Sequence, residues 1–348
     1  MTENPNVLPA HRFDERRLEE WLAANLDGFA GPMTVSEFKG GQSNPTYRLT
    51  TLDASYVLRR KPPGTLLPSA HAVDREYRII HALAETDVPV PRTFLLCEDE
   101  SVVGTMFYVM DFLDGRIFFD PRLPEVSSDQ ERAAIFDAMN EVIAALHNVG
   151  YKAVGLGDFG REGGYVARQI GRWSKQYKAS ETDSIDTMER LMAWLPEHLP
   201  AHDETTLVHG DFRLDNLVFH PTEPRVIGVL DWEIATLGNP LADFAYHVMA
   251  WRVSPEEFRG LREVGITALG IPGEAAYVAA YAKRTERDAL PDWEFYMAYN
   301  LFRMAAILQG IMGRVRDGTA ANPEAARMGA LVRPLANLAW AQAEKIGD

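Results

Sequence analysis

Three side chains in one part of this chain have the types and spacing that phosphoryl transfer requires. The stretch from His209 reads H-x-D-x-x-x-x-N, which supplies Asp211 and Asn216, and Asp231 follows an apolar segment. Transfer of a phosphoryl group from a nucleotide needs a carboxylate beside the acceptor hydroxyl and oxygen ligands for the metal ion on the phosphates. We therefore expect ATP and Mg²⁺ as cofactors, with Asp211 as the base and Asn216 and Asp231 as the metal ligands.

Short apolar segments flank these residues and predict the elements that position them. Residues 207–208 precede the motif, residues 217–219 follow it, and residues 226–230 run into Asp231, with prolines in the turn between the last two segments. Strand, polar loop, strand, turn and strand is the local order that a catalytic loop and a metal-binding aspartate require.

Other roles are open for the residues of this loop. Asp211 and Asn216 can be turn residues that hydrogen-bond their own backbone, although the complete set favours chemistry. A histidine at the position of His209 more often braces a loop than carries a proton, so a structural role is favoured. Arg213 and Asp215 are candidates for contacts to phosphate, with a structural role slightly favoured.

The rest of the chain separates into a strand-rich part and a helical part. Residues 14–26 and 72–84 carry apolar side chains at helical spacing. The expected strands of the first part cover 33–38, 45–51, 55–61, 92–97 and 105–111. After residue 112 the pattern becomes mainly helical. The expected helices begin after Ser128 and then cover 164–180, 185–197, 240–251, 255–264, 274–286, 293–315 and 323–344.

The segment from Leu207 to Asp231, together with Leu237-Gly238-Asn239-Pro240-Leu241-Ala242-Asp243, resembles the aminoglycoside phosphotransferase family. The resemblance extends over residues 15–320 and points to the branch that is fused to, or encoded beside, acyl-CoA dehydrogenases. It implies an α+β, bilobal protein-kinase-like fold, with a small antiparallel-sheet N-lobe that has one helix and a larger, mainly helical C-lobe. Residues 1–112 would bind nucleotide, and residues 113–348 would carry the catalytic loop and the acceptor site. An acyl-CoA dehydrogenase is implied as a partner protein.

A loop in the N-terminal part has residues suited to phosphate binding. Gly40 and Gly41 lie between the first two expected strands, and glycine lets a hairpin backbone approach a ligand closely. Ser43 and Asn44 add side-chain donors. Taken alone, an ordinary hairpin explains the loop equally well, but its position ahead of the strand at 55–61 favours nucleotide binding.

That strand is similar to the protein-kinase strand that ends in a phosphate-binding lysine, but the aligned residue is Arg59. Alternation places Val57, Arg59 and Lys61 on one face. Val57 would cover the adenine, and Arg59 is favoured over Lys61 for the phosphates. Glu76 lies on the apolar face of the following helix, where an unpaired charge is costly. We expect it to pair with Arg59, as lysine and glutamate pair in kinases; the alternative is that Glu76 reaches water.

The resemblance also assigns the adenine contact and the residues after the metal-binding aspartate. Met110, Asp111 and Phe112 would form the connector whose backbone bonds the adenine edge. Trp232-Glu233 stands where protein kinases have Phe-Gly, which is typical of small-molecule kinases and disfavours a protein kinase. Asp243 is expected to brace the catalytic loop through backbone donors; an ordinary acid at a helix start is the alternative.

A basic, aromatic segment precedes the catalytic loop. Residues 163–180 carry no acid, in a chain whose formal net charge is −15. The segment's four basic residues are Arg168, Arg172, Lys175 and Lys178. In the family an insert at this place shapes the acceptor pocket, so the basic insert suits a small, anionic hydroxylated acceptor such as a hydroxyacyl-CoA. A solvated basic face is the alternative. Arg303 is a further candidate for the cleft.

Other functions stay open at this point. An aminoglycoside, sugar or choline-like acceptor is the first alternative. From another class, a nucleotide-binding pseudokinase with a regulatory role is supported only by Arg59 in place of lysine.

Composition bears on partners and location. Acidic residues number 50 against 35 basic ones, which disfavours nucleic acid as a partner, because binding it relies on a basic surface. No apolar run reaches the length of a membrane span, and the first residues lack the apolar region of a signal peptide. Cys97 is the only cysteine, so no intrachain disulfide forms. We expect a cytoplasmic protein with no membrane partner.

Overall fold

The computed structural model describes residues 6–38, 44–64, 71–318 and 325–346. Within these ranges the chain divides into two compact units. The first unit comprises the residues up to Arg116 with Leu217–Thr222 and Val226–Ile234; the second comprises Ile117–Asn216, Glu223–Arg225 and the residues from Ala235 onward. The division of nucleotide binding and catalysis between residues 1–112 and 113–348 stays a prediction.

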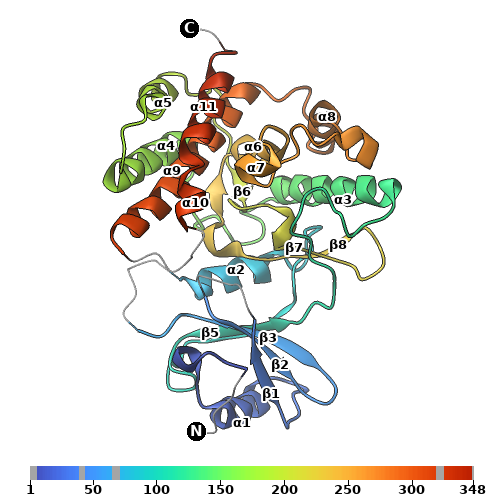
Figure 1. The fold of residues 1–348 in the computed structure, drawn as a ribbon. Helices are drawn as coiled ribbons and strands as arrows, with labels where there is room; N and C mark the ends of the chain where they lie inside the picture. Colours follow the sequence, from blue (N-terminus) through green and yellow to red (C-terminus); the bar gives the residue numbers. More distant parts are fainter. Residues whose placement is uncertain (1–5, 39–43, 65–70, 319–324, 347–348) are drawn as a thin grey trace. The chain divides into compact units, whose positions relative to one another are not determined.

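The first unit is built on a five-stranded antiparallel sheet in the order β1-β2-β3-β5-β4 (Figure 1). Its strands are β1 (Thr34–Glu37), β2 (Thr46–Thr50), β3 (Ser55–Arg60), β4 (Thr93–Cys97) and β5 (Phe107–Asp111). Its longer helices are α1 (Glu15–Asn25) and α2 (Val73–Leu83). The five expected strands and both expected helices of this part are therefore present.

One face of the sheet and α1 share a hydrophobic core. Tyr47, Leu49 and Leu58 of the sheet are buried together with Leu18 and Leu22 of α1. Side chains two apart on a strand, and four apart on a helix, point the same way, which explains why these residues meet. This core holds β3, the central strand of the sheet, in place, and Arg59 lies on β3.

Helix α2 packs against β4 and β5. Its buried face consists of Val73, Ile79, Ile80 and Leu83 and also includes Glu76. The prediction that Glu76 lies on the apolar face of this helix is confirmed, since its side chain is only 1% exposed.

A short hairpin of the first unit leads to Asp231. Its strands are β7 (Leu217–Phe219) and β8 (Val226–Val229), which pair antiparallel. The chain then enters a 3-10 turn, Trp232–Ile234. Trp232 is buried, and its Nε1 donates to the Val229 carbonyl at 2.9 Å. This buried indole anchors the turn that follows Asp231.

The second unit is mainly helical (Figure 1). Its longer helices are α3 (Asp129–Asn148), α4 (Tyr165–Ser180), α5 (Asp186–Glu197), α6 (Pro240–Val248), α8 (Glu274–Arg284), α9 (Trp293–Arg316) and α11 (Val332–Ala343). Helix α9 packs against α4, α6 and α11 and is buried on most of its sides. A two-stranded sheet pairs β6 (Thr206–Val208) with β9 (Thr236–Gly238). The order of helices agrees with the prediction, whereas β9 was not expected.

Two predicted helices differ from the structure. In place of a helix over 255–264, α7 covers only Pro255–Phe258, and Arg259 follows with a left-handed φ of 44°. A side chain at Gly260 would lie 1.8 Å from the Val253 carbonyl oxygen, so the chain turns back on itself here. In place of one helix over 323–344, the described part has α10 (Ala325–Gly329) and α11, separated by a turn.

Among the residues that the structure describes, no helix has the length and apolar character needed to cross a bilayer.

Candidate active site

Arg59 is the centre of an ion-pair network in the first unit. Its Nε lies 2.6 Å from Glu76 Oε2, and its Nη2 lies 3.0 Å from Asp231 Oδ1 and 3.6 Å from Glu233 Oε2. The predicted pair of Arg59 and Glu76 is therefore present. One guanidinium connects β3, α2 and the turn after β8, so it holds Asp231 at the surface of the unit through direct contact.

The environment of Glu76 explains why this charge is tolerated in the core. The Asn44 side-chain amide donates to Glu76 Oε1 at 2.6 Å, and the Tyr108 hydroxyl donates to Oε2 at 3.3 Å. Burial raises the pKa of Glu76, and the adjacent Arg59 opposes that rise. Buried charges need both a partner and hydrogen bonds, and Glu76 has both.

Lys61, the other candidate for the phosphates, has a different partner. Its Nζ lies 3.7 Å from Asp74 Oδ1, and both side chains are partly exposed. Of the two cations, Arg59 is the one that contacts the carboxylate of Asp231.

Asp231 has an unusual backbone conformation, with φ at 63°. Only glycine enters this left-handed region freely, although aspartate tolerates it better than most residues. Residues held in such conformations concentrate at functional sites because the surrounding structure must over-determine them. The buried Trp232 and the ion pair with Arg59 do so here.

Only some of the residues predicted to bind nucleotide are among those that the structure describes. Gly40, Gly41 and Ser43 lie outside the described residues. Asn44 is described, and its side chain contacts Glu76 and His71, so it braces the ion-pair network.

Val57 and Met110 are directly opposite each other on β3 and β5. The Asp111 N–H donates to the Arg92 carbonyl at 2.8 Å. The Phe112 ring stacks near Phe38 and lies under the Arg48 guanidinium, 4.0 Å from its Cζ. Met110 and Asp111 therefore end β5, and Phe112 begins the segment that follows this strand.

In the second unit, Asp243 holds the loop that carries Asp211. Its Oδ2 accepts the His209 N–H and its Oδ1 accepts the Gly210 N–H, both at 2.8 Å. Asn239 caps the helix that presents it, since its side chain accepts the N–H groups of Leu241 and Ala242. The prediction that Asp243 braces this loop through backbone donors is confirmed.

The buried Asp243 keeps its charge through its surroundings. His147 Nε2 lies 3.3 Å from its Oδ2. Burial alone would raise the pKa of Asp243, but His147 and the His209 amide hold that pKa below its usual range.

Replacing Asp243 by Asn is expected to lower kcat about 10- to 100-fold, because two amides that orient the loop lose a charged acceptor, a contact worth about 1.5–3 kcal/mol each. We expect the free energy of unfolding to fall by the energy of one such contact, about 1.5–3 kcal/mol. Initial-rate kinetics and denaturant titration measure the two effects. A matched control is Asp203→Asn, since Asp203 lies in the same unit and binds Gly164 instead; full activity in Asp243→Asn would contradict the bracing role.

Three side chains surround the Asp211 carboxylate. The Tyr246 hydroxyl donates to Oδ1, Arg213 Nε lies 3.1 Å from Oδ1, and Asn216 Nδ2 donates to Oδ2 at 3.2 Å. The Asp211 N–H donates to His209 Nδ1 at 3.2 Å, which agrees with a bracing role for that histidine. Asp211 and Asn216, predicted to act together, are thus in contact.

Tyr246 is a site residue that the sequence did not reveal. Burial, followed by the charge of Asp211, raises the pKa of its hydroxyl, so it stays a neutral donor. It lies on α6 three residues after Asp243, and residues three apart share a helix face. That spacing is the signal by which it could have been found. Arg303, which was a candidate, donates to the Gly210 carbonyl at 2.7 Å and lies 4.9 Å from the Tyr246 ring.

The four basic residues of α4 have separate surroundings. Arg168 donates to the carbonyls of Arg161 and Gly163, and Lys178 pairs with Glu181 and Glu189. The side chains of Arg172 and Lys175 are exposed. Two of the four charges are therefore used locally, which narrows the predicted basic surface to Arg172 and Lys175.

The burial of His247, next to Tyr246 on α6, makes the stability of the folded protein depend on pH. It is buried, and its Nε2 lies 2.7 Å from the Tyr277 hydroxyl. Burial lowers the pKa of His247 from 6.5 to about 4, although Asp243 opposes this. Between these values the unfolded chain binds a proton that the folded chain does not, so stability falls as the pH drops from 6.5 to 4, by up to about 1.4 kcal/mol per pH unit.

Denaturant titrations at pH 7, 5.5 and 4.5 test this dependence. His247→Gln should have a shallower loss of stability on acidification than the wild type. His202→Gln removes an exposed histidine and should keep the wild-type slope. Equal slopes for all three proteins would contradict a buried, neutral His247.

The features of the two units define a class of protein. The first unit has a small antiparallel sheet with an Arg–Glu pair, and the second is helical and carries an H-x-D-x-x-x-x-N loop. These are the parts of a protein-kinase-like phosphotransferase. Residues 34–299 match the model of the phosphotransferase enzyme family APH. The chain belongs to this family.

Relatives and solved structures agree with that membership. Acyl-CoA dehydrogenase family member 10 of Mus musculus is 47% identical over 350 positions, which cover 99% of this chain but 33% of the relative. The chain spans between a third and 43% of the length of the first curated relatives.

A crystal structure from Ralstonia eutropha, provisionally described as an aminoglycoside phosphotransferase, has a TM-score of 0.89 at 54% identity and covers 96% of this chain and 99% of its own. A thermostable mutant of the aminoglycoside phosphotransferase APH(4)-Ia, solved with AMP-PNP and hygromycin B, shares the fold with a TM-score of 0.59 at 16% identity, over 93% of this chain and 97% of its own. The predicted fold class, α+β and protein-kinase-like, is confirmed.

Proposed function

We propose that this protein is an ATP- and Mg²⁺-dependent phosphotransferase that phosphorylates a hydroxyl group of a small molecule. The observation that carries the proposal is the Asp211 carboxylate, which Tyr246, Arg213 and Asn216 hold on a loop braced by Asp243. A carboxylate fixed in this way can accept the proton of an acceptor hydroxyl, and positioning is most of what this chemistry asks of a protein.

The remaining roles follow from the donor types in each unit. Mg²⁺ prefers oxygen ligands, and Asp231 and Asn216 offer a carboxylate and an amide oxygen. The Asn216 Nδ2 donates to Asp211, which turns its amide oxygen away from that carboxylate, and this oxygen would serve as the metal ligand. Mg²⁺ would offset the charge that develops on the phosphates. Arg59 adds a fixed cation beside Asp231, supported by Glu76.

The nucleotide-binding residues are proposed from the sequence and their place on the sheet. Val57, which lies opposite Met110 on the adjacent strand, would cover the adenine ring, and the backbone of Met110, Asp111 and Phe112 would bond its edge. Gly40, Gly41, Ser43 and Asn44 would lie near the phosphates, where Asn44 acts through Glu76.

For the acceptor we propose a hydroxyacyl-CoA. The mouse relative is an acyl-CoA dehydrogenase family member, which supports an acyl-CoA substrate and an acyl-CoA dehydrogenase as partner protein. Arg172 and Lys175, exposed on α4, suit the anionic part of such a molecule. An aminoglycoside is the alternative, because a structure with this fold contains hygromycin B.

An acceptor panel tests the proposal. ATP, Mg²⁺ and protein are incubated with 3- and 4-hydroxyacyl-CoAs, an aminoglycoside or choline, and products are identified by mass spectrometry. We expect a phosphorylated acyl-CoA that requires Mg²⁺ and is absent with Asp211→Ala. Nucleotide binding without transfer to any of these acceptors would instead leave an acceptor outside the panel or a pseudokinase.

A further inference from the structure

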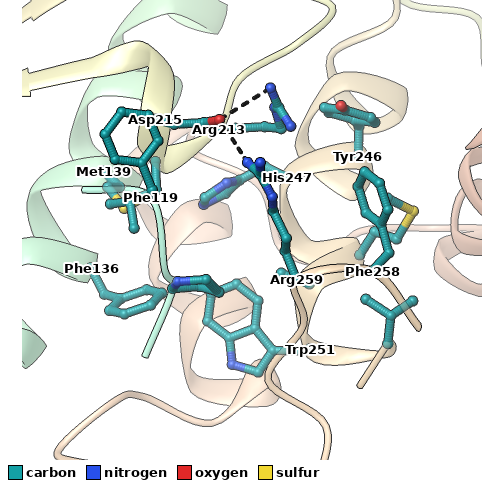
Figure 2. Close-up of a pocket in the computed structure, with 15 residues that line it drawn as sticks. Phe119, Phe136, Met139, Arg213, Asp215, Tyr246, His247, Trp251, Phe258 and Arg259 are labelled. Atoms are coloured by element: carbon teal, nitrogen blue, oxygen red, sulfur yellow. Dashed lines mark hydrogen bonds and ion pairs between the residues drawn. The ribbon is translucent and has the colours of Figure 1, made fainter. Parts of the chain in front are cut away.

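The second unit contains a pocket that the phosphoryl-transfer residues do not account for. Its walls are mainly apolar, its cavity volume is about 70 Å³, and it is partly open to solvent (Figure 2). We call it the apolar pocket; its principal lining side chains are Phe119, Phe136, Met139, Tyr246, Trp251 and Phe258.

The apolar pocket is lined by two residues that contact the candidate base. Tyr246 and Arg213 both line it, and both contact the Asp211 carboxylate. When the hydroxyl of an acceptor approaches Asp211, the rest of the acceptor therefore lies next to this pocket. Phe119, at 64% exposed, is an unusually accessible aromatic wall, as expected where a ligand completes the burial.

The acid in the lining of the apolar pocket is paired with two arginines. Asp215 is the only acid among the described residues that line it. Its Oδ2 lies 3.3 Å from Arg213 Nη2 and 3.0 Å from Arg259 Nη1 (Figure 2). Burial keeps His247 neutral near pH 7 by lowering its pKa to about 4. The lining therefore offers no unpaired carboxylate to a cationic ligand, which argues against a polycationic acceptor.

We propose that the apolar pocket binds an aliphatic chain of the acceptor and so selects long-chain over short-chain substrates. This assignment rests on the proposed function, because it places the acceptor hydroxyl at Asp211. It goes further in assigning selectivity for chain length to residues that hold no phosphate or metal. Each methylene buried in such a site should tighten binding about fourfold.

The experiment uses 3-hydroxyacyl-CoAs with chains of 4, 8 and 12 carbons as probes. Dissociation constants are measured by titration calorimetry, and kcat/KM for phosphate transfer is measured in parallel. We expect at least tenfold tighter binding and higher kcat/KM from 4 to 8 carbons.

Two variants and one control locate the effect. Phe119→Ser removes the exposed aromatic wall, and Ala250→Phe adds bulk to a lining position. Each variant should reduce the increase in affinity from 4 to 8 carbons at least fivefold. Leu199→Ser removes an exposed apolar side chain outside the lining of the apolar pocket and should keep the wild-type series. Thermal unfolding of each variant verifies that it is folded.

The outcomes separate the two proposals. Transfer that does not depend on chain length, or that Phe119→Ser and Ala250→Phe both leave unchanged, overturns the pocket assignment and leaves the kinase function standing. Chain-dependent binding that these variants weaken, without transfer to any probe, supports the chain-binding role of the apolar pocket and counts against phosphorylation of these acceptors.

Discussion

Replacing Asp211 by Asn is expected to lower kcat for phosphate transfer about 1,000-fold, since a positioned base contributes about 10²–10⁴-fold. Asparagine keeps the shape of the side chain and can still accept the hydrogen bond of Tyr246. It cannot take up the proton of an acceptor hydroxyl. The loss should therefore fall on kcat, with the dissociation constant of AMP-PNP changed less than about threefold.

Tyr246→Phe serves as the companion variant. It removes the hydroxyl that contacts Asp211 but leaves the carboxylate in place, so we expect a smaller loss, about 10-fold. Steady-state kinetics and calorimetry distinguish the two variants. If Asp211→Asn retained a tenth of the wild-type kcat, Asp211 would not be the base.

Replacing Arg59 by Met should both destabilise the first unit and abolish transfer. The variant leaves Glu76, which is 1% exposed, as an uncompensated charge in the core, and removing one partner of a buried pair costs about 3–5 kcal/mol. Nucleotide affinity should also fall, because the cation beside Asp231 is lost. Denaturant titration and calorimetry with AMP-PNP measure the two effects.

The double variant Arg59→Met with Glu76→Met separates stability from function. Replacing both members of a buried pair by apolar residues is often neutral, so the double variant should recover most of the stability while staying inactive. Lys61→Met is the matched control, directly after the same strand: its 3.7 Å contact with Asp74 is partly exposed and worth less than about 1 kcal/mol. If Lys61→Met, and not Arg59→Met, lost nucleotide affinity, the phosphate role would belong to Lys61.

Features that depend on local spacing could be predicted from the sequence. The position of Glu76 on an apolar helix face requires a partner, and strand alternation put Arg59 within reach; the ion pair is present at 2.6 Å. Asp243 follows a capped helix start and was expected to brace the catalytic loop through backbone donors; the structure identifies those donors as the amides of His209 and Gly210. In each case the period or start of one element placed the side chain, and the resemblance to kinases supplied its partner.

Features that depend on packing between distant segments could not be predicted. Tyr246 reads as one more aromatic residue of an apolar helix until α6 is placed against the loop that carries Asp211. The pairing of Asp215 with Arg259, 44 positions apart, likewise depends on tertiary structure. The helix over 255–264 was wrong because Gly260 packs against Val253, and such a contact overrides helix propensity.

The basic insert shows how composition alone can mislead. Four cations without an acid suggested an insert that suits an anionic acceptor, but Lys178 pairs with Glu181 and Glu189, which lie just beyond the segment. Arg168 is used by backbone carbonyls at the start of its own helix. Charge within a window of sequence therefore overstated the charge available to a ligand.

An isotope experiment tests the central claim most directly, that an acceptor hydroxyl attacks the terminal phosphate of ATP with Asp211 as base. A 3-hydroxyacyl-CoA labelled with ¹⁸O in its hydroxyl is incubated with ATP, Mg²⁺ and either wild-type protein or Asp211→Asn, and the phosphate ester is analysed by mass spectrometry. We predict an ester that retains the label in its P–O–C bond and forms only with the wild type. ATP consumed with release of inorganic phosphate alone, or equal ester formation by both proteins, would contradict the claim.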